Sequence, residues 1–239
     1  MANAPISGLT ADITFAGGYT TNGFMWVVNH GAAMNDNTPF TPADNFRTRT
    51  AATPLLDWGG RYVCHYPVTS ATTIAGPAYL AYPVSYNLRL TSEVLEDTAF
   101  TDTARSYTAG LLDASGSYDV IVDTDTEMPV AGTAANGVFT IGVGVSYTIP
   151  LIVGDCSVNV SADGSQRLVS ASFAASAATT VAGAAPLPGV SGAATFTAAA
   201  LQTYAGNIIV TSVEVSMDAQ RETGQLSFEF VGDGVCTPA

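Results

Sequence analysis

The chain has 239 residues, enough for one hydrophobic core of ordinary size. Twenty acidic residues face seven basic ones, all of them arginines, and the formal net charge is −13. This balance argues against a protein that wraps nucleic acid, because phosphate contacts require clustered lysine and arginine. An acidic surface instead favours solubility, and it also repels phosphate.

Several further classes are disfavoured by simple patterns. No run of about eighteen apolar residues exists, so no membrane-spanning helix is expected. The N-terminal residues lack a basic stretch followed by an apolar one, so no secretory signal is predicted. Cys64, Cys156 and Cys236 are too few and too scattered for a disulfide framework or a zinc site. We therefore expect reduced thiols in a protein made in a cytoplasm.

The first part of the chain is predicted to contain two strands and a long loop. Residues 11–15 alternate as a short strand, and residues 23–29 form an apolar run typical of a buried strand. Residues 35–44 are rich in Asn, Asp and Pro, which indicates an exposed loop.

Residues 55–66 form an aromatic segment with Trp58, Tyr62 and Tyr66. The residues alternate, but neither face is purely apolar. Such a pattern is typical of a strand at a subunit contact, and equally of an edge strand in a monomer. The following residues, 68–82, are small and polar and are predicted to form a loop.

Residues 84–120 contain the clearest early pattern. Alternation places Val84, Tyr86, Leu88 and Leu90 on one face and Ser85, Asn87, Arg89 and Thr91 on the other. A loop over residues 98–113 is predicted next, and it carries Arg105 and Tyr107. A second strand is expected over residues 117–123, after Gly116.

Residues 123–127 place three acids at alternate positions. A calcium loop of the EF-hand type requires glycine at its sixth position and glutamate at its twelfth. Met128 occupies the sixth position here, so a solvated loop is favoured over a metal site.

The following residues are predicted to form further core strands. Residues 138–153 are apolar throughout, as in one or two strands of a core sheet. Residues 156–160 and 168–173 flank an Asp-Gly step within residues 161–165, which predicts a hairpin.

Residues 174–200 are of low complexity, mostly Ala, Thr, Gly and Pro. Pro186 and Pro188 would break a helix, so we expect an extended surface loop or arm, with a short helical turn over residues 196–201. A linker between two domains is the alternative, but too little chain follows to build a second core. A single domain over residues 1–239 is therefore predicted.

The C-terminal part is predicted to form a hairpin of residues 208–217 and 225–231. In the first strand, alternation separates Ile209, Val213, Val215 and Met217 from Ser212, Glu214 and Ser216. In the second, it separates Leu226, Phe228 and Phe230 from Ser227 and Glu229. Residues 235–239 are expected to form a tail.

Two of these blocks share a pattern with a known family. Residues 84–120 show a strand, then E-x-L-x-x-T-x-F, an Arg and a Tyr, G-L, and S-G-S-Y. Residues 204–234 show Y-x-G-x-x-I-V, a polar turn, and L-x-F-x-F-x-G-x-G. In this order the two blocks resemble the major tail tube proteins of long-tailed bacteriophages.

The resemblance implies a fold and a function. The fold would be all-β, a β-sandwich or partly closed barrel of the tail tube type with at most one short helix, long loops and an elaborated N-terminal third. The function would be a virion structural protein of the tail, made in the host cytoplasm. It would assemble with itself into stacked, six-membered rings and contact other tail proteins. Genomic DNA would pass through without specific binding, and no membrane would be involved.

This interpretation singles out two groups of residues. Glu214 and Glu229 are expected to face the lumen, where carboxylates repel passing phosphates. Alternation assigns a face but not a direction, so an ordinary position on the outside stays open for both. The residues expected at contacts between subunits are Trp58, Tyr62, Tyr66, Arg105 and Tyr107.

No catalytic constellation is evident, and we expect neither an enzyme nor a cofactor or metal site. Only His30 and His65 are present, and no G-x-S-x-G motif, phosphate-binding loop or dinucleotide fingerprint occurs. Cys64 and His65 are adjacent, and neighbours on a strand point to opposite faces, so they cannot form a catalytic pair. A carboxylate pair of the glycosidase type stays open, because any acidic β-protein offers candidates.

Two other functions stay open at this point. One is a decoration or connector protein of the virion with a tube-like fold. The other is a secreted or surface β-sandwich that binds glycans or calcium.

Overall fold

The computed structural model describes residues 10–15, 19–29, 58–67, 72–123, 128–142, 144–183, 185–198, 202–219 and 223–238. The predicted loop over residues 35–44 lies outside the described residues, as do acidic residues 124–127. No α-helix occurs in the described part of the chain, and no helix there is long and apolar enough to cross a membrane.

The described residues form fourteen strands. Their bounds are β1 Thr10–Phe15, β2 Tyr19–Asn29, β3 Trp58–Pro67, β4 Thr73–Ala75, β5 Leu80–Ala81, β6 Pro83–Glu96, β7 Tyr107–Asp123, β8 Ala134–Gly142, β9 Val145–Val160, β10 Gln166–Ala175, β11 Thr180–Ala182, β12 Ser191–Ala198, β13 Gln202–Asp218 and β14 Thr223–Pro238.

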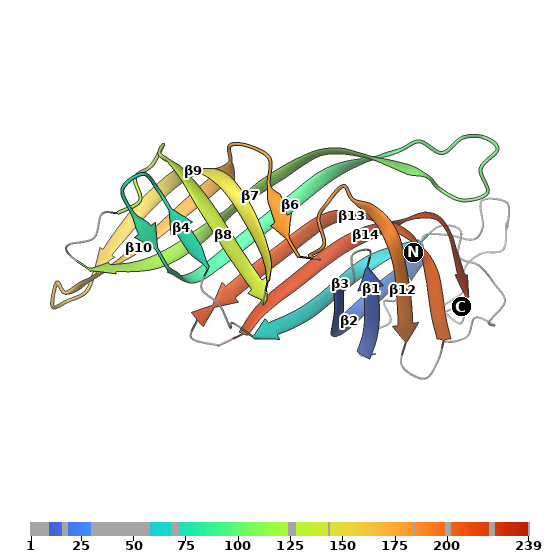
Figure 1. Ribbon diagram of the computed structural model, residues 1–239, viewed down its shortest axis with the longest axis horizontal. Coiled ribbons are helices and arrows are strands. Elements are labelled where there is room, and N and C mark those ends of the chain that lie inside the picture. Colours follow the sequence, from blue (N-terminus) through green and yellow to red (C-terminus); the bar gives the residue numbers. More distant parts are fainter. Residues whose placement is uncertain are drawn as a thin grey trace.

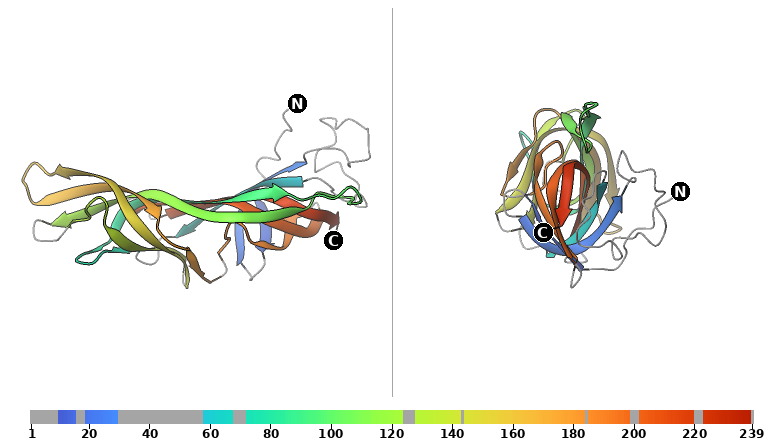
Figure 2. Two further views of the ribbon diagram at one scale, coloured as in Figure 1. Left: turned by 90° about the horizontal axis from the view of Figure 1, so that it is seen from above. Right: turned by 90° about the vertical axis from the view of Figure 1, so that its right-hand side faces the viewer.

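All strands belong to one antiparallel sheet in the order β12-β1-β2-β3-β14-β13-β6-β7-β10-β9-β8-β4-β5, with β11 paired to β9 (Figure 1). A further ladder between β12 and β13 connects the first six strands of this order into a local circuit. The sheet as a whole does not close, and the molecule is elongated (Figure 2). The prediction of an all-β fold is confirmed, while its assignment to the tail tube type stays a prediction.

The sheet buries one face by curling over itself. Phe139 of β8 lies against Tyr86 of β6, with ring centroids 5.1 Å apart, although three strands separate β8 from β6 in the sheet. Phe139 also stacks on Phe173 of β10, at 5.4 Å. Tyr86 in turn shares a buried hydrogen bond of 3.1 Å with the hydroxyl of Tyr66 on β3. These contacts gather the apolar faces of distant strands into one core.

The strongest sequence patterns agree with the structure. On β6, Tyr86, Leu88 and Leu90 are buried, while Asn87 and Arg89 are exposed. Val84, predicted on the buried face, is only partly buried, because a register shift between Pro83 and Ser85 interrupts the alternation at this end of the strand. The apolar run over residues 138–153 forms parts of β8 and β9.

The predicted Asp-Gly turn joins β9 to β10. Gly164 adopts a φ of 72°, a conformation that glycine tolerates without steric cost. The carboxylate of Asp163 accepts hydrogen bonds from the Ser161 hydroxyl and the Ser165 N–H, which hold the pKa of Asp163 at about 2.

The loop predicted over residues 98–113 is shorter than expected, because β7 begins at Tyr107. A register shift opposite residues 92–94 of β6 places one extra residue in β7, where Gly110 and Leu111 stand opposite Glu93. This bulge interrupts the alternation, so the beginning of the strand has no period-two signature.

Two segments predicted as loops contain strands. Residues 68–82 include β4 and β5. The low-complexity segment includes β11 and β12, and residues 196–198 are strand where a helical turn was expected; residues 199–201 lie outside the described residues.

The low-complexity segment is attached to the core rather than projecting as an arm. The Tyr147 hydroxyl donates a buried hydrogen bond of 2.7 Å to the carbonyl of Pro186. The N–H of Gly189 donates to the carbonyl of Val210, at 2.8 Å. Ala, Gly and Pro carry no side-chain pattern, so these tertiary contacts were not predictable locally.

The C-terminal hairpin is present as β13 and β14, with two differences. A register shift between Val210 and Ser212 reverses the alternation, so Ile208 and Val210, not Ile209, share the core face with Val213. The predicted tail is also strand as far as Pro238, and Cys236 is fully buried.

Gly116 of β7 permits a close approach that the core requires. A Cβ atom at this position would collide with the backbone carbonyl of Asn87 and with the ring of Phe173. We predict that Gly116→Ala lowers the free energy of unfolding by about 1–3 kcal/mol, the usual cost of overpacking. Urea denaturation measures this loss. Gly142→Ala is the matched control, because its Cβ would meet only Val145 at 4.0 Å. Equal stability of both variants would contradict the prediction.

Candidate functional site

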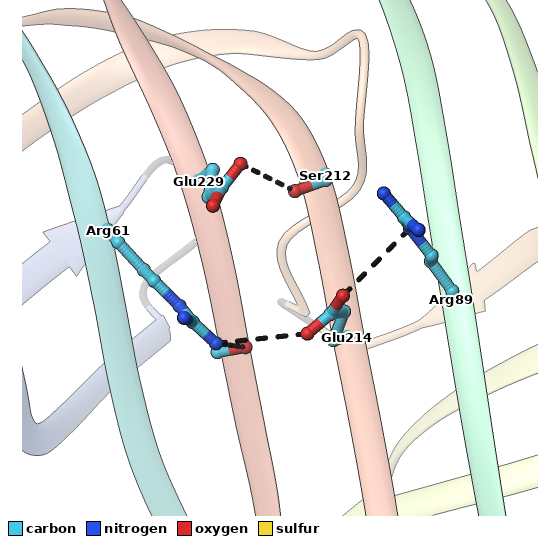
Figure 3. A network of polar contacts seen from close by, with 6 residues as sticks. Arg61, Arg89, Ser212, Glu214 and Glu229 are labelled. Atoms are coloured by element: carbon cyan, nitrogen blue, oxygen red, sulfur yellow. Dashed lines mark hydrogen bonds and ion pairs between the residues drawn. The ribbon is translucent and has the colours of Figure 1, made fainter.

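The face of the sheet opposite the core carries a set of charged residues on four adjacent strands. Strands β3, β14, β13 and β6 lie side by side in this order. Their core face is apolar, and the opposite face presents exposed charged side chains (Figure 3). These side chains are Arg61 on β3, Glu229 on β14, Glu214 on β13 and Arg89 on β6.

The register of the ladders places these residues next to one another. Glu214 stands opposite Arg89 on one side, and Glu229 stands opposite Arg61 on the other. Oppositely charged cross-strand neighbours are favourable in an antiparallel sheet. Across the four strands the order is therefore Arg, Glu, Glu, Arg, so each acid has a base on a neighbouring strand, although these residues are far apart in the sequence.

Glu214 is the centre of this charged network. Its carboxylate oxygens lie 3.8 Å from Nη2 of Arg61 and 3.9 Å from Nε of Arg89. Arg61 also donates to the hydroxyl of Ser227, at 3.2 Å. The hydroxyl of Ser212 donates to Glu229, at 3.4 Å (Figure 3).

The charges of this network balance, since two arginines accompany two glutamates. Exposed ion pairs at such separations are each worth about 0–1 kcal/mol and weaken in salt. Glu214 and Glu229 face away from the core, as alternation predicted. The surface around them is nevertheless not purely acidic, because arginines on neighbouring strands offset the two carboxylates. Their position in a lumen stays a prediction.

Three residues predicted at subunit contacts lie instead inside the chain's own core. The exposed fractions of Trp58, Tyr62 and Tyr66 are 2%, 0% and 8%. Strand β3 is not an edge strand, because it pairs with both β2 and β14, and its aromatic face packs against Phe228 and Phe230. These three side chains therefore pack within the chain itself, and a contact with a neighbouring subunit stays an untested prediction for them.

The other two predicted contact residues lie where the β6–β7 hairpin meets β14. Arg105 is partly exposed, and its Nη1 lies 3.6 Å from Glu96. The carbonyl of Arg105 accepts a hydrogen bond of 2.8 Å from the N–H of Gly234. The N–H of Tyr107 donates to the carboxylate of Asp233, at 3.3 Å. These bonds hold the hairpin in place, and a contact with a neighbouring subunit stays a prediction.

A cleft of about 740 Å³ is a second feature, which the sequence did not indicate. Asp119 lies in it and accepts hydrogen bonds of 2.5 Å from the hydroxyls of Ser85 and Ser170. The cleft combines residues from five strands with two short connections, so no local motif marks it. Its lining residues are Val84, Ser85, Asp119, Ile121, Asn159, Val160, Ser161, Gln166, Leu168, Asp218 and Ala219.

Possible metal and thiol sites are limited by geometry. No group of three or more His, Cys, Asp or Glu side chains suited to a metal occurs among the described residues. The three cysteines form no disulfide with one another. Burial raises the pKa of the Cys236 thiol to about 12, and burial together with the neighbouring Asp155 raises the pKa of Cys156.

No model of a known protein family matches the sequence, and no curated protein matches it. The resemblance to tail tube proteins therefore depends on the residue pattern of the two blocks.

The thiols should differ in reactivity. Only the thiolate attacks a disulfide reagent, and a raised pKa keeps the thiol protonated at mildly alkaline pH. We expect Cys64 and Cys236, both buried, to be modified only after unfolding in urea, and Cys156 to react slowly in the folded protein. Absorbance with an aromatic disulfide reagent measures this. Cys156→Ser should remove the slow phase, and rapid modification of two or more thiols in the folded protein would contradict the prediction.

Glu214 should contribute little to stability despite its two partners. We predict that Glu214→Gln lowers the free energy of unfolding by about 0.5 kcal/mol at low ionic strength, and less at high ionic strength, because the pairs are exposed and screened. Urea denaturation at both ionic strengths measures this difference. Glu93→Gln, an exposed glutamate of the same sheet outside this network, is the control. A loss of several kcal/mol that salt does not change would count against simple surface pairing.

Proposed function

We propose that this chain is the tail tube subunit of a long-tailed bacteriophage. It is a structural protein of the virion, without enzymatic activity, and is made in the host cytoplasm. Copies of the chain assemble into stacked rings that form the conduit for genomic DNA. Its partners are further copies of itself and other tail proteins, and DNA passes without specific binding.

One observation carries this proposal: the two blocks that resemble the family are adjacent in the sheet. Residues 84–120 form most of β6 and β7, and residues 204–234 form most of β13 and β14. Residues 212–218 of β13 pair with residues 85–91 of β6. Two patterns separated by more than eighty residues of sequence thus form one continuous unit, β7-β6-β13-β14, near the middle of the strand order. If the chain had the fold of that family, the two blocks would be expected to lie next to each other in the sheet.

The charged face of this unit suits a conduit. In the proposal, Glu214 and Glu229 face the lumen. An arginine without a partner would hold a phosphate bidentately, but Arg61 and Arg89 both lie beside Glu214. Because two arginines balance two glutamates, this network is neither a basic patch that would bind passing DNA nor an acidic patch that would strongly repel it. This property agrees with passage without specific binding.

Assembly is the direct test of the proposal. We expect the purified full chain at high concentration to form rings or stacked-ring tubes in electron micrographs, and to sediment as assemblies much larger than one chain. Virion decoration or connector proteins would give single rings or isolated complexes, and a monomeric binding module would give single particles. Sedimentation as a monomer at every concentration would overturn the proposal.

A further inference from the structure

The β6–β7 hairpin extends beyond the central sheet as a two-stranded ribbon (Figure 1). Strand β13 pairs with β6 only as far as Thr91, and β10 pairs with β7 only from Ser115. The strands between these points pair mainly with each other. The hairpin therefore extends past the ends of these two ladders, where hydrogen bonds to Gly234 and Asp233 attach it to β14, and its turn lies at one end of the long axis of the molecule (Figure 2).

This ribbon exposes three large apolar side chains. Phe100 in the turn is fully exposed, Leu111 is 91% exposed and Leu95 is 54% exposed. Leu111 lies in the β-bulge of β7. The bulge adds one residue to this strand and changes the direction in which the side chains of the strand face. Apolar side chains grouped at a projecting end are typical of a contact surface.

The turn that carries Phe100 is preorganised by its own hydrogen bonds. The carboxylate of Asp102 accepts from the N–H of Ala99 at 2.7 Å, and the N–H of Asp102 donates to the carbonyl of Ala99 at 3.0 Å. The hydroxyl of Thr98 accepts from the N–H of Ser106, at 3.1 Å. A turn held in one conformation loses little entropy on binding.

The turn between β9 and β10 lies near the opposite end of the long axis (Figure 2). Residues of this turn and its flanks, Val160, Ser161 and Gln166, belong to the lining of the cleft described above. Ile121, Val160 and Leu168 line it and are themselves exposed. Ile121 and Leu168 are cross-strand partners on β7 and β10, and therefore share one face of the sheet. The cleft thus offers a concave apolar surface that complements a projecting apolar turn.

The hairpin also brings one base, Arg105, together with the acids Glu96, Asp97 and Asp102, to an acidic cleft. Asp119 and Asp218 line the cleft, and no basic side chain occurs among its described lining residues. Residues 98–105 of the hairpin contain one acid, Asp102, and one base, Arg105. Arg105 is partly exposed beside the apolar turn, at an ion-pair distance from Glu96 of 3.6 Å. Docking would bring this guanidinium toward the two carboxylates of the cleft.

We propose that the tip of the β6–β7 hairpin of one copy docks in the cleft of the next copy. Phe100 and Leu111 pack against Ile121 and Leu168, and Arg105 approaches Asp119 and Asp218. The choice of a second copy as the partner rests on the proposed function.

The two surfaces are different and lie at opposite ends, so the contact is heterologous, and its repetition gives a closed ring or a filament. A few apolar side chains bury less than the roughly 800 Å² per partner of a standard interface. One contact alone is therefore weak, and growth requires every copy to use both surfaces.

Disulfide trapping between separate copies tests this contact even if it is weak. A Phe100→Cys chain is mixed with a Leu168→Cys chain and oxidised, and covalent dimers are measured on denaturing gels. We expect this mixture to give more dimer than Phe100→Cys mixed with Val130→Cys, which alters another exposed apolar position. The unmodified chain measures the background from the native thiols. Equal yields in the two mixtures, or trapping mainly between two Phe100→Cys chains, would overturn the proposal.

Sedimentation of surface variants separates this inference from the proposed function. In the tip variant, Phe100→Ser and Leu111→Ser remove the apolar side chains of the hairpin. In the cleft variant, Ile121→Ser and Leu168→Ser remove apolar side chains that line the cleft. Val130→Ser with Val190→Ser is the control, because it alters two exposed apolar side chains elsewhere. We expect loss of assemblies for the tip and cleft variants but not for the control, with folding checked by circular dichroism. If all three assemble like the unmodified chain, the docking contact is wrong and the proposed function stands. If the unmodified chain is monomeric, both fail.

Discussion

The described structure depends on one constraint: the apolar face of a single sheet has to be buried by the sheet itself, because no α-helix occurs in the described residues to cover it. The packing of Phe139 against Tyr86 and Phe173 shows how it is met, because these rings come from strands that are separated in the sheet. Aromatic side chains are large enough to span the gap between two parts of a curled sheet. The close approach of β6, β7 and β10 at Gly116 serves the same packing.

The same constraint explains the candidate surfaces. Among the described residues, the sheet folds its apolar face inward and exposes charged side chains on its other face. On that face the strands β3, β14, β13 and β6 carry Arg61, Glu229, Glu214 and Arg89 in cross-strand contact, and toward the β9–β10 turn the polar pattern gives way to the apolar cleft beside Asp119. The paired charges and the exposed apolar side chains therefore lie on different parts of one face of the sheet. The first part has no net charge, and the second is the surface proposed for docking.

Small residues are integrated into this fold through backbone groups. The segment around Pro186 has few side chains able to define a structure, yet its carbonyl accepts the hydroxyl of Tyr147 in the interior. Without this donor the buried carbonyl would be unsatisfied, which would lower the free energy of unfolding by about 1–3 kcal/mol. Gly189 likewise donates to β13 through its N–H. A region of low complexity is thus ordered by hydrogen bonds from residues far away in the sequence.

The sequence by itself determined the all-β class, the β9–β10 turn, the faces of β6 from Tyr86 onward and those of the C-terminal hairpin beyond its bulge, because alternation and Asp-Gly turns are local properties. It also placed Glu214 and Glu229 away from the core. Only the tertiary structure decided that Trp58, Tyr62 and Tyr66 face the chain's own interior, since this depends on which strands flank β3. The bulges that turn Leu111 outward and move Ile209 off the core face depend on the pairing register. The cleft and the Arg61–Glu214–Arg89 network join strands distant in the sequence, so no local pattern could reveal them.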